Sequence, residues 1–182
     1  MNVTVKSLTW TNPNGYGLCV EGEEASVEMV GVSVKECGGS GLFATRGASV
    51  KATQCEFSDN RADGVFIYQR SKGIFTDCSF HHNGDEGVKA SDEGTLVELR
   101  GEQTEIHHNG EVGLFAMSDA TLNIHIPSQS ITALIHDNGE EDEDSQDLGT
   151  FDGAKIQSQL SSSSLELTVI QEAPPEEEED LM

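Results

Sequence analysis

Three stretches of the chain between Val50 and Ala116 are near-copies of one another, and this repetition constrains the fold more than any other feature. In each copy a short apolar run leads to a corner, and a glycine then opens a second apolar run. The glycines are Gly64, Gly87 and Gly113, which lie 23 and 26 residues apart. A period in this range, with short alternating runs broken by Asn and Gly, is typical of a solenoid of stacked coils.

The same register continues towards the amino terminus through Gly17 and Gly41, at spacings of 24 and 23 residues. One apolar column stands seven residues before the glycines and consists of Trp10, Val34, Phe57, Phe80 and Ile106. A second stands one residue after them and consists of Leu18, Leu42, Val65, Val88 and Leu114. Because successive side chains of a strand point to opposite sides, the columns predict the inward faces of two strands per coil.

A third strand is predicted about ten residues past each glycine. Its inward pairs are Val27 and Met29, Val50 and Ala52, Ile74 and Thr76, Val97 and Leu99, and Leu122 and Ile124. The fold is therefore expected to be all-β: a single-stranded parallel β-helix of about six coils, each with three short strands. At one corner Asn60, Asn83, Asn109 and Asn138 fall in register. Asn suits such a corner because its amide can donate to one rung and accept from the next, and because it tolerates a left-handed φ.

The repeated pattern of Asn, three residues, Gly and Val or Leu resembles the right-handed parallel β-helix repeat family. Relatives in that family include pectate lyase-like enzymes and carbohydrate-binding and sugar-hydrolase repeat domains. The resemblance covers roughly Val3 to Gly139 and implies a right-handed coil. It does not imply an activity, because the matching residues are those that build the coil.

One β-helix domain is expected over residues 1–170, followed by an acidic tail over 171–182 that is expected to be disordered. An acidic loop is inserted near 139–150, where the run from Glu140 to Asp144 replaces a tight turn. Ile131, Ala133 and Ile135 are expected to supply the first strand of the sixth coil. Leu165 to Val169 are expected to form part of a seventh coil or to cover another face.

The composition excludes several classes of partner. Asp and Glu outnumber Lys and Arg by 33 to 10, a net charge of -23, so nucleic acid and anionic membrane surfaces would be repelled. The chain as given has no signal sequence and no run of 18 apolar residues, so a cytoplasmic location is expected. Cys19, Cys37, Cys55 and Cys78 lack the spacing of a zinc site and are expected to be free thiols.

Two polar patterns were considered as sites. His81, His107 and His136 share one column, and His82 and His108 share the next, but parallel ladders seldom direct three rings at one point, so no metal site and no cofactor are expected. Sugar cleavage requires paired carboxylates. Glu56 and Glu105 share a column that Ser79 interrupts, while Asp59, Asp63, Asp85, Glu86 and Glu111 are expected in turns. No ladder of aspartates with an adjacent Lys or Arg is predicted, so no catalytic residue is assigned.

The outward positions of the strand that follows each glycine are unexpectedly aromatic. One column reads Cys19, Phe43, Phe66, Lys89 and Phe115, and the next includes Tyr68. Three explanations are open for an exposed aromatic row: a sugar-stacking surface, a contact for a protein partner, or a surface that Gln157 to Ile170 of the same chain covers.

The sequence therefore favours a non-catalytic binding or scaffold module. Its expected contact surface for a glycan or a protein partner consists of Phe43, Phe66, Tyr68, Lys89 and Phe115. A polysaccharide lyase or glycoside hydrolase is the alternative, and only the family resemblance supports it.

Overall fold

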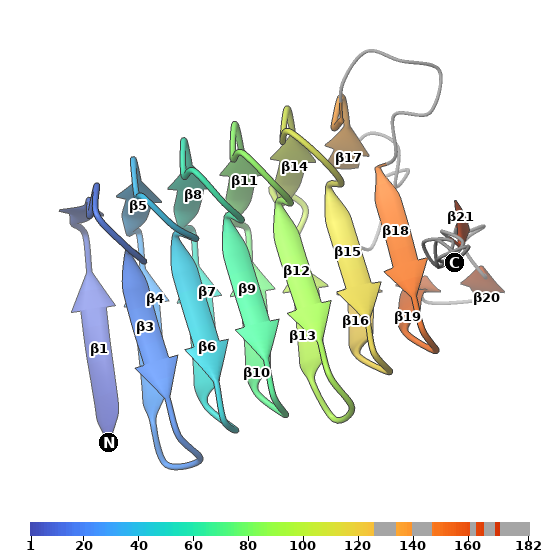
Figure 1. The fold of residues 1–182 in the computed structure, drawn as a ribbon, viewed down its shortest axis with the longest axis horizontal. Coiled ribbons are helices and arrows are strands. Elements are labelled where there is room, and N and C mark those ends of the chain that lie inside the picture. The colour runs from blue at the N-terminus through green and yellow to red at the C-terminus, as the bar shows by residue number, and fades with distance from the viewer. Residues whose placement is uncertain (126–133, 140–146, 161–162, 166–169, 172–182) are drawn as a thin grey trace, which may run out of the picture.

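The protein is a parallel β-solenoid built from three sheets that run along its length (Figure 1). The computed structural model describes residues 1–125, 134–139, 147–160, 163–165 and 170–171. We call the three sheets A, B and C. Successive strands belong to A, B and C in turn, so β1 to β18 make six successive triplets of strands. This agrees with the prediction of an all-β solenoid of about six coils.

The strands of each sheet pair in parallel, except that β20 is antiparallel to β19. Sheet A consists of β1 (Asn2–Lys6), β4 (Ser26–Val30), β7 (Ser49–Thr53), β10 (Lys72–Thr76), β13 (Leu96–Arg100), β16 (Thr121–His125), β19 (Lys155–Leu160) and β20 (Ser163–Leu165). Sheet B consists of β2 (Thr9–Trp10), β5 (Ser33–Lys35), β8 (Glu56–Ser58), β11 (Ser79–His81), β14 (Glu105–His107) and β17 (Ile135–His136). Sheet C consists of β3 (Leu18–Glu21), β6 (Leu42–Thr45), β9 (Val65–Tyr68), β12 (Val88–Ser91), β15 (Leu114–Met117), β18 (Leu148–Phe151) and β21 (Ile170–Gln171).

The core is a set of side-chain ladders, as the columns predict. On sheet B, Phe57 pairs with Phe80 and their rings stack 5.4 Å apart at an interplanar angle of 7°. Val34 and Ile106 continue the ladder on either side, and both are buried. The predicted register of this strand is therefore confirmed.

Trp10 is an exception, because its side chain is 42% exposed although its backbone pairs in register with Val34. The prediction that Trp10 is a buried, inward residue is wrong, because β2 lies on the first coil and no described strand stacks on its outer side. Leu8 and Val3 of the same coil are also exposed. An apolar hollow of about 380 Å³ opens at this end, between β1, β3 and β4.

The prediction that Ile74 and Thr76 point inward is wrong. Gly73 and Phe75 take the inward positions, opposite Val50 and Ala52 of β7. The turn before β10 is one residue shorter than the turn before β13: Gly73 follows Gly64 by nine residues, whereas Val97 follows Gly87 by ten. A slip of one residue moves every side chain of a strand to the other face.

Gly73 and Phe75 fit together in the core. A Cβ at residue 73 would lie only 2.6 Å from Cε2 of Phe75, so the missing side chain makes room for the aromatic ring. The Phe75 ring meets Phe57 and Phe80 edge-on, at centroid distances of 6.0 and 5.5 Å. This T-shaped arrangement is a favourable one for aromatic pairs.

The corner between sheets B and C carries the predicted asparagine ladder. Each Nδ2 donates to the Oδ1 of the next rung, at 2.9 Å from Asn60 to Asn83, 2.9 Å from Asn83 to Asn109 and 2.8 Å from Asn109 to Asn138. All four side chains are buried. The ladder also explains the periodic glycines, since a Cβ at Gly64 would lie 2.8 Å from Nδ2 of Asn83 and 2.6 Å from the carbonyl oxygen of Gly87.

The last described strands continue the coil. Ile135 stacks on Ile106 as expected, β18 pairs with β15, and β21 adds to the edge of β18. Ile131, Ala133, the acidic run 140–144 and residues 166–169 lie outside the described residues, as does all of the expected tail beyond Gln171. The four cysteines are free thiols. Within the described part of the chain, no helix is long and apolar enough to span a membrane.

Candidate functional site

The outward side of sheet C carries a continuous row of aromatic rings. Its strands bring Phe43, Phe66, Lys89 and Phe115 into one ladder by direct backbone pairing. The Phe43 and Phe66 ring centroids are 5.4 Å apart, and Tyr68 lies 5.5 Å from Phe66 and 6.5 Å from Phe43. The structure therefore brings together all five residues that the sequence singles out, and these rings are half-buried.

Lys89 is the one non-aromatic residue between Phe66 and Phe115 in this ladder, and its ammonium group lies close to both rings. Its Nζ lies 5.8 Å from the centroid of Phe66 and 5.5 Å from that of Phe115. A cation within about 6 Å of a ring face is attracted by the negative face of the aromatic system. Lys89 thus connects the two halves of the row.

Tyr16 extends the row at its amino-terminal end, and sequence reasoning missed it. Its ring stacks on Phe43 with centroids 4.8 Å apart, and its side chain is 45% exposed. Tyr16 precedes Gly17 in a turn, so it is absent from the strand columns. We call Tyr16, Phe43, Phe66, Tyr68, Lys89 and Phe115 together the aromatic face.

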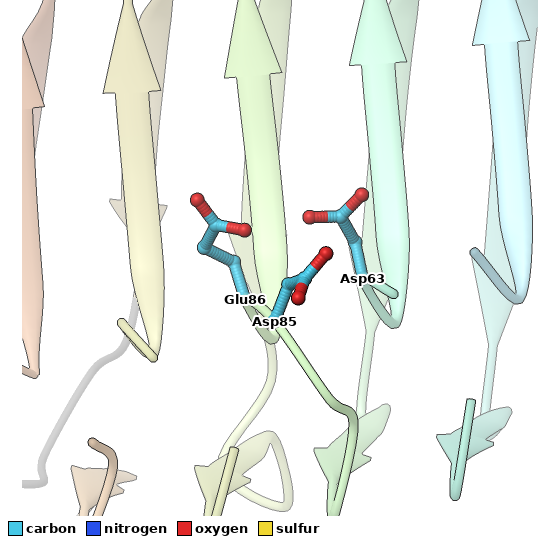
Figure 2. Close-up of side chains that lie close together, drawn as sticks. All are labelled: Asp63, Asp85 and Glu86. Atoms are coloured by element: carbon cyan, nitrogen blue, oxygen red, sulfur yellow. The ribbon is translucent and has the colours of Figure 1, made fainter. Parts of the chain in front are cut away.

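A buried acidic pair lies beside the aromatic face. Asp63 and Glu86 each stand one residue before the glycine that opens a sheet C strand, and both are at most 5% exposed. The Ser40 Oγ in the same column donates to Asp63 Oδ2 at 2.8 Å. Figure 2 shows the two carboxyl groups and that of Asp85 gathered next to the starts of neighbouring strands.

Lys89 also links this acidic pair to the rings. Its Nζ donates to Glu86 Oε1 at 2.8 Å and lies 4.0 Å from Asp63 Oδ1. Burial lowers the pKa of Lys89, but Glu86 and Asp63 outweigh that effect and the net shift is upward. The amine therefore stays protonated at neutral pH.

The other oxygen of each carboxyl group in the pair has no hydrogen-bond partner among the described residues. These atoms are Asp63 Oδ1 and Glu86 Oε2, and both are buried. Burial and the hydrogen bond and charge of Asp63 raise the pKa of Glu86 to about 7, although Lys89 acts in the opposite direction. Glu86 is therefore partly protonated near neutral pH.

Sequence reasoning placed Asp63 and Glu86 in turns but did not bring the two carboxyl groups together with Lys89. The column one residue before each glycine holds unlike residues, Ser40, Asp63 and Glu86 among them, so no single residue type marks it. One oxygen from each of Asp63, Asp85 and Glu86 lies within 4.8 Å of the others, close enough to surround a cation. The ammonium of Lys89 already neutralises part of this charge.

The two carboxylates considered on the strands of sheet B, Glu56 and Glu105, do not pair with each other. Glu56 and Glu105 lie on the outward side of sheet B, two rungs apart with Ser79 between them. Glu56 accepts a hydrogen bond from Ser33 Oγ at 2.7 Å and lies 3.2 Å from His81 Nε2. Glu105 is exposed.

The histidine columns form as predicted. Centroids of His81 and His107 are 5.1 Å apart and those of His107 and His136 are 5.3 Å apart, with nearly parallel rings. His82 and His108 form a second stack at 5.2 Å. These five imidazoles lie at the carboxyl ends of the sheet B strands β11, β14 and β17, and they do not contact the aromatic face.

A polar groove of about 900 Å³ follows the turns between sheets C and A. It gathers the cations Arg46, Arg70 and Lys72, but Glu23, Asp92 and Glu93 line it as well. Arg46 is also bonded to Glu21. The charges of the groove largely neutralise one another, so the groove has no strong preference for an anion.

Comparison with known proteins identifies the coil and no activity. A family model described as a right-handed beta helix region matches residues 1–131, which is most of the chain. No curated protein and no solved structure matches significantly.

Proposed function

Because the chain belongs to the family of right-handed β-helix regions, which specifies a fold and not an activity, we propose a function from its surface. The protein is a non-catalytic binding or scaffold module, and its aromatic face is the contact surface for a glycan or a protein segment.

One observation carries this proposal: the unbroken row of ring contacts from Tyr16 through Phe43 and Phe66 to Lys89 and Phe115. Aromatic side chains on an outward strand face are costly to hydrate, and a contiguous exposed group of them typically marks a binding surface. Their rigidity also lowers the entropic cost of binding.

The shape of the face suits an extended ligand. Its rungs repeat along the solenoid axis, so a linear chain could contact several rings in succession. The flat rings offer apolar contact, and the half-buried Lys89 offers one charged group in the middle of the row. Both a sugar chain and an extended peptide meet these requirements.

The test is a glycan array and a partner pull-down on the same protein preparation, comparing wild type with Phe66→Ala. Removal of a central ring is expected to weaken binding by about tenfold or more. Ile74→Ala is the matched control, because Ile74 is a half-buried apolar residue on the outward side of sheet A. Equal binding by wild type and Phe66→Ala would exclude the aromatic face as the contact surface.

The acidic pair supports a second candidate function, a polysaccharide lyase or glycoside hydrolase. The pKa of Glu86 is raised to about 7, which suits a general acid, and Glu86 is hydrogen-bonded to Lys89 of the aromatic face. Polysaccharide turnover that is lost in Glu86→Gln and retained in Glu105→Gln would favour this function. Binding without turnover in wild type would favour the module.

A further inference from the structure

The five stacked histidines form a feature that the proposed function does not use. Each of three successive rungs ends in a pair of adjacent polar side chains: His81–His82, His107–His108 and His136–Asp137. We call these pairs the histidine ladder. The same two-residue pattern precedes Asn83, Asn109 and Asn138, so the asparagine ladder fixes its register.

The backbone turns both members of each pair to the same side. Neighbouring side chains of a strand normally point to opposite faces. Here the second member adopts a left-handed conformation, with φ of 55° at His82, 54° at His108 and 55° at Asp137. The change of conformation at the corner therefore brings two consecutive side chains together.

The paired donor atoms converge at nearly the same distance on every rung. The two Nδ1 atoms are 2.9 Å apart in His81–His82 and 2.8 Å apart in His107–His108. On the third rung His136 Nδ1 lies 2.8 Å from Asp137 Oδ2. Two donors bound at right angles to one metal at about 2.0 Å are separated by about 2.8 Å, which is the spacing of neighbouring ligands in a tetragonal site.

We propose that the histidine ladder binds divalent transition metal ions of tetragonal preference, Cu(II) or Ni(II), through the paired donors of each rung. Two imidazole nitrogens on each of the first two rungs, or one imidazole nitrogen and one carboxylate oxygen on the third, occupy neighbouring positions, and solvent completes the coordination. Imidazole is a favoured ligand of both ions. Each rung is a separate site, because ring centroids of successive rungs are 5.1 and 5.2 Å apart, too far for one ion to reach both at bonding distance.

The surroundings support cation binding. Glu56 contacts His81, and Asp137 caps the third rung. A net charge of -23 raises the local concentration of cations around the whole protein.

The inference is independent of the aromatic face, because the ladder is built on sheet B and its corner. The test is isothermal titration of untagged protein with Ni²⁺ in a Cys19→Ser background, which removes the exposed thiol as a competing ligand. Wild type is compared with the double variant His82→Asn/His108→Asn. Asn tolerates the left-handed φ of both positions, so the coil is expected to fold. The sixth histidine, His125, lies outside the ladder, and His125→Gln is the matched control.

Saturable Ni²⁺ binding by wild type and His125→Gln is expected, with a lower stoichiometry in the double variant, which loses the sites of the first two rungs and keeps the His136–Asp137 site. Cu²⁺ electron paramagnetic resonance of the wild type provides a readout that needs no variant, with nitrogen hyperfine splitting expected. Equal Ni²⁺ stoichiometry in all proteins would overturn the inference and direct attention to Asp63, Asp85 and Glu86. Absence of binding, or a Cu²⁺ spectrum with oxygen ligands only, would equally overturn it and leave the paired nitrogens as hydrogen-bond partners.

Discussion

Single residues of this coil differ in chemistry mainly because of the turn in which they lie. Asp63 and Glu86 occupy one turn position on successive rungs, so stacking forces two carboxyl groups together in a buried place. Like charges at this separation cannot both ionise without cost, and one proton relieves it. Ser40 and Lys89 occupy the remaining polar contacts. Stacking of the coils therefore brings ordinary turn residues together in a buried place and raises the pKa of one of them, Glu86.

The shifted pKa makes the stability of the fold depend on pH. Folding raises the pKa of Glu86 from 4.5 to about 7, so the folded state binds more protons than the unfolded state between these values. Protonated Glu86 contributes fully to the free energy of unfolding below about pH 4.5. This contribution, on the order of 3 kcal/mol, is lost as the pH rises to about 7. Glu86→Gln keeps a neutral hydrogen-bond donor and should remove this part of the pH dependence.

Chemical denaturation at pH 5, 6, 7 and 8 measures the effect. Relative to wild type, Glu86→Gln is expected to gain stability as the pH increases through this range. The exposed Glu105→Gln should instead follow the wild-type curve. Parallel curves for wild type and Glu86→Gln would show that protonation of Glu86 is not coupled to folding.

At the scale of the strands, periodicity predicts the ladders and fails at the turns. Phe57, Phe80 and Ile106 could be placed because an inward column stays apolar on every rung. Ile74 could not, because one residue fewer in a turn shifts the face of the next strand without changing its hydrophobicity. Tyr16 and Glu86 were missed as site residues for a related reason: turn positions carry no alternating pattern, and their burial depends on the neighbouring coils.

The ladders predict where truncation is costly. Phe57→Ala and Phe80→Ala should each reduce the free energy of unfolding by about 3–5 kcal/mol, since each removes a fully buried ring from the cluster with Phe75. Glu56→Ala, on the outward side of the same sheet, should cost no more than about 1 kcal/mol. Urea titration of the three variants measures these differences. A large loss in Glu56→Ala with a small loss in Phe80→Ala would mean that the sheet faces are reversed.

The whole molecule combines a one-dimensional core with a strongly negative charge. Every coil contacts mainly its two neighbours, so stability is approximately a sum of coil and interface contributions. The sequence predicts this architecture well, because every rung repeats the same pattern of apolar positions and so gives the register again. It predicts the site less well, because the aromatic face, the acidic pair and the histidine ladder depend on which unlike residues become neighbours across rungs.

The excess of 33 acidic over 10 basic residues should make the fold sensitive to salt. Stacking brings acidic side chains of successive coils closer than they are in the unfolded chain, so self-repulsion opposes folding. NaCl shortens the screening length from about 30 Å at 0.01 M to about 10 Å at 0.1 M. The Tm is therefore expected to rise by a few degrees as NaCl is added, which differential scanning calorimetry measures.

Most of the rise in Tm should occur below about 0.3 M NaCl, because the screening length is by then as short as the spacing between neighbouring charges. A Tm that is constant at low salt and increases only in proportion to concentration up to 1 M would indicate solute exclusion rather than relief of repulsion.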